Sequence, residues 1–172
     1  GKDPNGGDVI GLYPILPDDT CCFLAIDFDD GAWRENVAAV RSVCTDWNIP
    51  SGVERSRSGE GAHLWIFFEE PIPCVTARKL GSALLTEAME QEGKLKLDSY
   101  DRMFPNQDTL PNGGFGNLIA LPLQGGPRKA GNSLFVDERL VPYYDQWEFL
   151  SRISTITKER FTALRSRACS EK

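Results

Sequence analysis

A run of six apolar residues leads directly into a cluster of carboxylates between Cys21 and Asp30. A short apolar run that ends at a turn signal predicts a buried strand. Because side chains alternate along a strand, Asp27 and Asp29 share one face, about 7 Å apart at their Cα atoms. These like charges repel each other, and a divalent cation that prefers oxygen ligands, such as Mg²⁺ or Mn²⁺, would offset the repulsion. Asp30 is interpreted instead as the cap of the following helix.

The apolar spacing along the rest of the chain predicts a mixed α/β domain. Leu24, Ile26 and Phe28 point away from the face that holds the two aspartates. Helices are predicted over 30–47, 76–91, 147–153 and 158–167, and strands over 8–13, 52–57, 62–68, 95–101, 117–124 and 132–137. The strands 52–57 and 62–68 form a hairpin, and 132–137 pairs back with 117–124 across a glycine-rich loop.

Composition limits the function classes. The chain of 172 residues is 41% hydrophobic and has no apolar run near bilayer length. Its net charge of −6 argues against a general polyanion-binding surface, although a local basic groove is compatible with it. Five scattered cysteines and one histidine form no zinc motif and fit reduced thiols in the cytoplasm. The polar start lacks a signal peptide and resembles a cut through a longer protein.

A second cluster of polar residues lies in the loop of the predicted hairpin. Gly59 and Gly61 let the backbone turn so that its N–H groups can converge on an anion. Ser58 adds a hydroxyl donor, and Arg57 adds a positive charge suited to phosphate. His63 follows the loop directly. The alternatives are a tight turn without a ligand and a purely structural histidine.

A two-metal site needs a third carboxylate, and the candidates are Asp101 and Asp108. Asp108 is preferred because it precedes a turn and a strand, which would bring it to a strand end beside Asp27. Arg128 and Lys129 lie in the glycine-rich loop and could reach the outer phosphates of a nucleotide, unless that loop is merely solvated. An aspartate metal site beside an anion-binding loop is typical of phosphoryl or nucleotidyl transfer.

At these three motifs the sequence resembles the archaeo-eukaryotic primase superfamily, the primase-polymerases. An apolar strand ending in Asp-x-Asp is matched by Ile26 to Asp29, and a Ser-x-His-type strand after a glycine-bearing loop is matched by Ser58 to His63. An apolar residue or amide followed by Asp is matched by Gln107-Asp108. The run 104–124 is similar to the subgroup found in multi-domain bacterial conflict or defence proteins with helicase and nuclease modules, and in CRISPR-associated primase-polymerases. The resemblance spans about 9–150.

The resemblance implies a two-part core, in which an α/β layer packs on an RRM-like antiparallel sheet with the active site in the cleft between them. It implies two Mg²⁺ or Mn²⁺ ions held by Asp27, Asp29 and Asp108. The zinc-binding element of some family members is absent here, which is a departure from the family, and no zinc is expected. The whole of 1–172 would form one catalytic domain. Its parts would be 8–92 for the first α/β part, 93–140 for the rest of the sheet and 145–172 for the terminal helices.

The resemblance also implies which residues contact the incoming nucleotide. The expected substrate-binding residues are Arg57, Ser58, Gly59, Gly61, His63, Arg128 and Lys129. The family serine two places before the histidine is Gly61 here, so its hydroxyl role would pass to Ser58. Arg55 would face either the template or the triphosphate, and Tyr13 is a conceivable gate against the ribose 2′-hydroxyl.

The implied function is a template-directed nucleotidyltransferase that uses nucleoside triphosphates to start or extend strands on single-stranded DNA, in replication, repair or defence. One alternative is a metal-dependent nuclease, because aspartates with two metals also cleave phosphodiesters. Another is a non-catalytic RRM-like module that stacks bases on Trp65 and Phe67.

Overall fold

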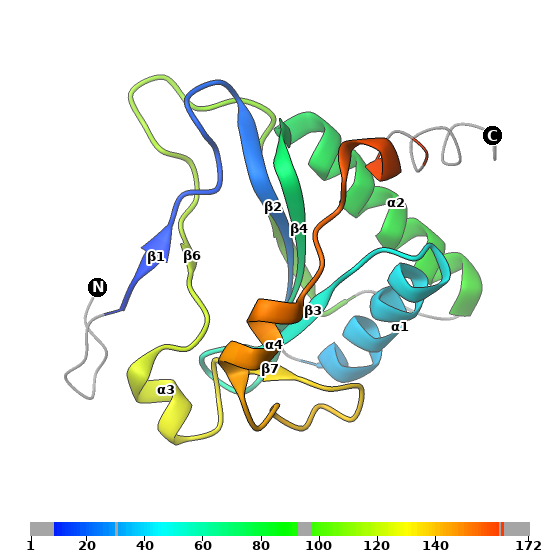
Figure 1. Cartoon of the computed structure of the whole chain (residues 1–172), viewed down its shortest axis with the longest axis vertical. Helices are drawn as coiled ribbons and strands as arrows, with labels where there is room; N and C mark the ends of the chain where they lie inside the picture. The colour runs from blue at the N-terminus through cyan, green and yellow to red at the C-terminus, as the bar shows by residue number, and fades with distance from the viewer. Residues whose placement is uncertain (1–8, 30, 93–97, 162, 164–172) are drawn as a thin grey trace.

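A computed structural model describes residues 9–29, 31–92, 98–161 and 163 of the chain (Figure 1). It has a mixed α/β fold with a five-stranded antiparallel sheet and a two-stranded sheet, which confirms the predicted fold class. The strands are β1 (Gly11–Leu12), β2 (Thr20–Asp29), β3 (Gly52–Arg55), β4 (Gly61–Pro73), β5 (Tyr100–Phe104), β6 (Ile119–Ala120) and β7 (Phe135–Val136). The helices are α1 (Trp33–Asp46), α2 (Cys74–Glu92), α3 (Gly125–Lys129) and α4 (Gln146–Arg152).

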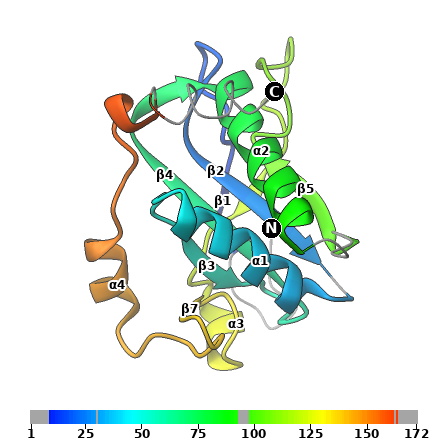
Figure 2. The same cartoon turned by 90° about the vertical axis from the view of Figure 1, so that its right-hand side faces the viewer.

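The larger sheet has the strand order β5-β2-β4-β3-β7, so the predicted central strand lies inside it. Helices α1 and α2 lie together on one face of this sheet (Figure 2). The small β1–β6 sheet lies on the other side (Figure 1). Both faces of the larger sheet are therefore at least partly covered by other elements.

Alternation along β2 divides its side chains between two cores, as predicted. Leu24, Ile26 and Phe28 are fully buried in the core shared with α1 and α2. Phe23 and Ala25 belong to a second cluster on the opposite face. The other buried members of that second cluster are Trp65, Phe104, Ile119 and Phe135. Asp27 lies on this second face, so the site borders the smaller core.

The two long helices bury the apolar stripes that the spacing of their residues predicted. Residues Trp33, Val37, Val40 and Cys44 of α1 are buried, as are Ala77, Leu80, Leu84 and Ala88 of α2. Asp30, the predicted cap, lies outside the described residues; Ala32 precedes α1 and makes no side-chain capping bond. The first described turn of α1 is thus not capped by a side chain.

The segment from 117 to 137 differs from its prediction. Strand β6 is only two residues long and pairs with β1, whereas β7 pairs with β3, so the predicted 117–124/132–137 hairpin is wrong. The glycine-rich stretch forms the short helix α3, because Pro127 is tolerated in a first helical turn. Strand pairing here is decided by which edge is open, and β3 offers a free edge to β7.

Two predicted elements lie partly outside the described residues. Strand β5 begins at Tyr100, and 93–97 lie outside the described residues. The predicted last helix begins at residue 158, but 164–172 are likewise outside. No helix among the described residues is long and apolar enough to cross a membrane. The subdivision of the domain at 92 and 140 stays a prediction, and β5 lies in the same sheet as β2.

Candidate active site

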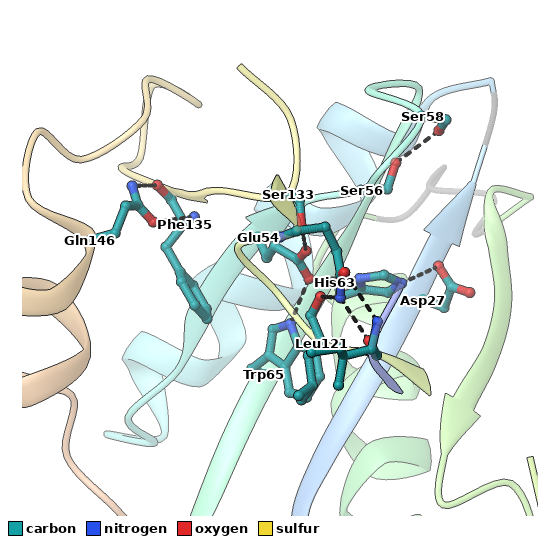
Figure 3. A network of polar contacts seen from close by, with 12 residues as sticks. Asp27, Glu54, Ser56, Ser58, His63, Trp65, Leu121, Ser133, Phe135 and Gln146 are labelled. Carbon is teal, nitrogen blue, oxygen red and sulfur yellow. Dashed lines mark hydrogen bonds and ion pairs between the residues drawn. The ribbon is translucent and has the colours of Figure 1, made fainter. Parts of the chain in front are cut away.

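Three charged side chains form a row across the larger sheet. Glu54 on β3, His63 on β4 and Asp27 on β2 are direct cross-strand partners. Directly opposed residues of antiparallel strands project to the same face, so strand register alone brings these side chains together. The imidazole ring of His63 lies between the two carboxylates (Figure 3).

The contacts of His63 determine its charge. Its Nδ1 lies 2.8 Å from Oε2 of Glu54, and its Nε2 lies 3.3 Å from Oδ1 of Asp27. Burial by itself would lower the pKa of His63, but the interactions with Asp27 and Glu54 outweigh burial and raise the pKa to about 10. In the metal-free protein the ring is therefore a cation at neutral pH, with one N–H donated to Glu54 and the other facing Asp27.

A β-bulge brings a third carboxylate to this face. Asp27 pairs with Arg102 and Phe28 pairs with Tyr100, which leaves Asp101 as the extra residue of β5. Bulges redirect side chains and interrupt strict alternation. Carboxylate oxygens of Asp27, Asp29 and Asp101 lie within 4.8 Å of one another. Asp101 of this acidic group also accepts a 2.5 Å hydrogen bond from Nε of its neighbour Arg102.

The acidic group fits a hard divalent cation. Asp27 is buried, and its Oδ1 forms a 3.3 Å ion pair with His63 but accepts no hydrogen bond from the described residues. A buried carboxylate oxygen that accepts no hydrogen bond is costly. Oxygen ligands of this kind are the ones that Mg²⁺ and Mn²⁺ prefer, so the residues present are suited to such an ion.

Gly61 leaves room for the Asp29 carboxylate. The two residues are cross-strand partners on β4 and β2. A Cβ at position 61 would lie 2.4 Å from the carbonyl oxygen of Phe28 and 2.5 Å from Oδ1 of Asp29. The serine that the related motif carries at this position would therefore collide with Asp29 where it now lies. This contact gives a physical reason for the departure from the motif.

Asp108 lies away from the acidic group. It forms an ion pair with Arg78 of α2. Nearby, the backbone N–H of Leu110 donates to Asp19, which precedes β2, at 2.7 Å. Because β5 runs antiparallel to β2, the chain after β5 travels toward the start of β2, whereas Asp27 lies near its end. The expectation that Asp108 sits beside Asp27 is thus not met, and Asp101, the other sequence candidate, takes that place.

The loop between β3 and β4 is held by its own hydroxyls. The Oγ atoms of Ser56 and Ser58 are 3.0 Å apart, and Ser58 Oγ accepts the backbone N–H of Glu60 at 3.2 Å. Gly59 has a φ of +86°, and a Cβ there would lie 2.8 Å from Oδ1 of Asn132. The loop is therefore a compact turn that packs against the segment following α3.

The predicted basic residues lie around this loop without a described ion-pair partner. Arg57 is exposed, and its carbonyl accepts a 3.4 Å hydrogen bond from Asn132. Arg128 and Lys129 are exposed in α3, a few residues before Asn132. Arg55 differs, because its Nη2 donates to the carbonyl of Leu140 at 2.8 Å. The chain segments that carry Arg57 and the pair Arg128–Lys129 thus lie near each other, and Arg55 is tied to another loop.

Glu54 is the site residue that sequence reasoning missed. It is 2% exposed and accepts hydrogen bonds from the side chains of His63, Trp65 and Ser133. The available signal was an acidic residue within a strand that the sequence predicts to pair with the strand of His63. Trp65, the proposed base-stacking residue, is itself 2% exposed, so it is a core residue and not an exposed platform.

Comparison with protein families decides the family of the chain. The model of the archaeo-eukaryotic primase domain of TOTE conflict systems matches residues 3–164. The chain belongs to this family. The primase domain matches no curated protein in a separate comparison. Family membership indicates a primase-like nucleotidyltransferase that interacts with nucleotides and nucleic acid, and it confirms the resemblance to the conflict-system subgroup.

Proposed function

We propose that this primase domain is a template-directed nucleotidyltransferase that starts or extends strands from nucleoside triphosphates. The observation that carries the proposal is the acidic group of Asp27, Asp29 and Asp101 next to His63, in a chain of the primase family. Two divalent cations, Mg²⁺ or Mn²⁺, would be held by these three carboxylates. When bound, they would supply Lewis-acid stabilisation of the phosphates and of the attacking 3′-hydroxyl.

The remaining residues would bind the triphosphate. His63 has its Nε2 edge on the side of Asp27, where it could donate to a phosphate oxygen. The Ser58 hydroxyl accepts the backbone N–H of Glu60 and can still donate its own proton, and Arg57, Arg128 and Lys129 offer positive charge near the loop that carries it. Charge of this sign would balance a triphosphate in an otherwise acidic protein. The predicted helicase or nuclease modules in the same protein remain an expectation.

Primer extension with matched aspartate variants tests the proposal. Asp101→Asn and Asp27→Asn remove ligand charge, so extension of a primer on single-stranded DNA with Mg²⁺ or Mn²⁺ should fall on the order of a hundredfold. Asp108→Asn is the control, because it changes an aspartate in an ion pair away from the acidic group, and it should retain extension within about threefold. Loss in Asp108→Asn with retention in Asp101→Asn would restore Asp108 as the third ligand.

The same assay distinguishes a primase-polymerase from the alternative, a metal-dependent nuclease. Both activities could use an acidic group of this kind. A primase-polymerase lengthens a labelled primer only when nucleoside triphosphates are present. Shortening of the primer that needs the aspartates and not the triphosphates would identify a nuclease and would contradict the proposal.

A further inference from the structure

The Glu54 carboxylate is the most buried charged group near the site, and all of its described contacts are with protein donors. Oε2 accepts from Nδ1 of His63 at 2.8 Å and from Nε1 of Trp65 at 3.1 Å. Oε1 accepts from Oγ of Ser133 at 3.3 Å. Figure 3 shows these contacts converging on the one carboxylate.

These contacts separate Glu54 from substrate. With 2% of its surface exposed, the side chain is not accessible to a nucleotide or to solvent. It lies on β3, with β4 between it and the acidic group on β2 and β5. Any effect of Glu54 on the reaction must therefore pass through a neighbouring side chain. Of the three described side chains that donate to Glu54, His63 is the one with a described contact to Asp27.

Stability alone is a poor explanation for a buried carboxylate here. A buried ion pair often contributes no more than well-packed apolar residues of similar volume. What an apolar residue could not do is accept Nδ1–H of His63. With Nδ1 held in this way, the orientation of the ring is fixed and Nε2 is directed to the side of Asp27.

We propose that Glu54 is a positioning residue, which orients the His63 imidazole so that Nε2 meets the phosphates of the bound nucleoside triphosphate. This inference rests on the proposed function, because the phosphate is the expected partner of Nε2. Glu54 also reaches the basic segment, since Ser133 Oγ accepts the backbone N–H of Gln124, the residue before α3, at 3.1 Å. One carboxylate thus connects the ring to the helix that carries Arg128 and Lys129.

Nucleotide binding by matched variants tests the positioning role. Glu54→Leu removes the acceptor, whereas Glu54→Gln keeps an amide oxygen that can accept from His63 and Trp65. Isothermal titration with an α,β-methylene analogue of dATP and of ATP in Mg²⁺ should show dissociation constants raised about tenfold by Glu54→Leu and less than about threefold by Glu54→Gln. Unchanged binding in Glu54→Leu would overturn the proposal.

Gln146→Leu is the control for a merely structural effect. Gln146 is also buried and makes three hydrogen bonds to backbone atoms of Phe135 and Tyr143, next to the same sheet (Figure 3). Gln146→Leu should lower the thermal midpoint, as is also expected for Glu54→Leu, but should leave analogue binding within about threefold. Equal weakening of binding by Gln146→Leu would overturn the proposal, because general destabilisation would then explain the loss.

A double-mutant cycle tests whether Glu54 acts through His63. In a His63→Ala background the ring is absent, so adding Glu54→Leu should weaken analogue binding by less than about twofold further. A second full tenfold loss in this background would mean that Glu54 acts elsewhere, and it would overturn the proposal.

The single histidine allows a direct measurement of the ring. Nitrogen-15 spectra of the imidazole contain signals from His63 alone, since the chain has one histidine. A slowly exchanging Nδ1–H is expected in the unsubstituted protein and in Glu54→Gln, and it should be lost in Glu54→Leu. If the unsubstituted protein bound neither analogue, the proposed function would fail, whereas persistence of this signal in Glu54→Leu would overturn the positioning role itself.

Discussion

At the scale of single residues, Asp29 lies against a glycine, and the missing Cβ decides where its carboxylate can sit. The neighbouring atoms at position 61 are a backbone oxygen and the carboxylate itself. Backbone cannot move away as the tip of a flexible side chain can. Gly61 therefore acts on the Asp29 side chain by leaving space for it.

Gly61→Ser tests this steric role. The new Cβ would displace Asp29, so Mn²⁺ affinity should fall at least about tenfold, and the free energy of unfolding should fall by about 1–3 kcal/mol. Calorimetric Mn²⁺ titration and urea unfolding measure the two effects. Gly125→Ser is the matched control, because nothing lies within 4 Å of a Cβ at that position. Normal Mn²⁺ binding by Gly61→Ser would show that Asp29 tolerates the new side chain.

The charge of His63 predicts a pH dependence of stability. Its pKa is raised from 6.5 to about 10 in the folded state, so its contribution to stability is fully present below pH 6.5 and is lost as the pH rises toward 10. With a metal chelator present, the difference in free energy of unfolding between the unsubstituted protein and His63→Gln should shrink as the pH rises from 6.5 to about 10. Urea unfolding at a series of pH values measures it. Thiols that titrate in the unfolded chain affect both proteins alike, so parallel profiles would contradict the predicted charge of His63.

At the scale of elements, the regular parts of the fold could be predicted and the irregular parts could not. Strand β2 and helix α1 follow directly from apolar spacing, and so do the hairpin β3–β4 and the stripe on α2. These segments have long, periodic patterns that only one secondary structure fits. The carboxylate pair of β2 was predicted for the same reason, because alternation fixes the face of each side chain.

The position of the third carboxylate could not be predicted from alternation. Strict alternation along β5 gives no reason to prefer Asp101 over its neighbours, and only the bulge opposite Asp27 brings it into the acidic group. A bulge leaves no clear sequence signal, because it depends on how two strands pair. The same limit explains Glu54 and β7, since Glu54 depends on the register between β3 and β4 and β7 depends on the open edge of β3.

At the scale of the whole molecule, one face of the larger sheet packs the main core and the other carries the candidate site. The face toward α1 and α2 holds the larger apolar core, and the opposite face holds the row of charged residues beside a smaller apolar cluster. Substitutions on the helix face should therefore act through unfolding. A ligand that binds the charged face of the folded state alone should raise the free energy of unfolding.

Metal binding should consequently stabilise the whole chain. At a free Mn²⁺ concentration one hundred times the dissociation constant, the folded state gains about 2.7 kcal/mol, equivalent to roughly 5–10 °C in the thermal midpoint of a chain of this size. Chelator should reverse the shift, Asp101→Asn should abolish it and Asp108→Asn should keep it. Differential scanning fluorimetry measures the shift, and an equal shift in Asp27→Asn would place the ion elsewhere.

The direct pairing of Asp27 with His63, and of His63 with Glu54, has a consequence for how such a domain can diverge. An insertion of one residue within β2 or β4 would turn every later side chain of that strand to the opposite face and dismantle the row. The connection at 105–118 lies outside these pairings. Relatives that keep the chemistry should therefore differ in length at that connection, while the spacing within each strand stays constant.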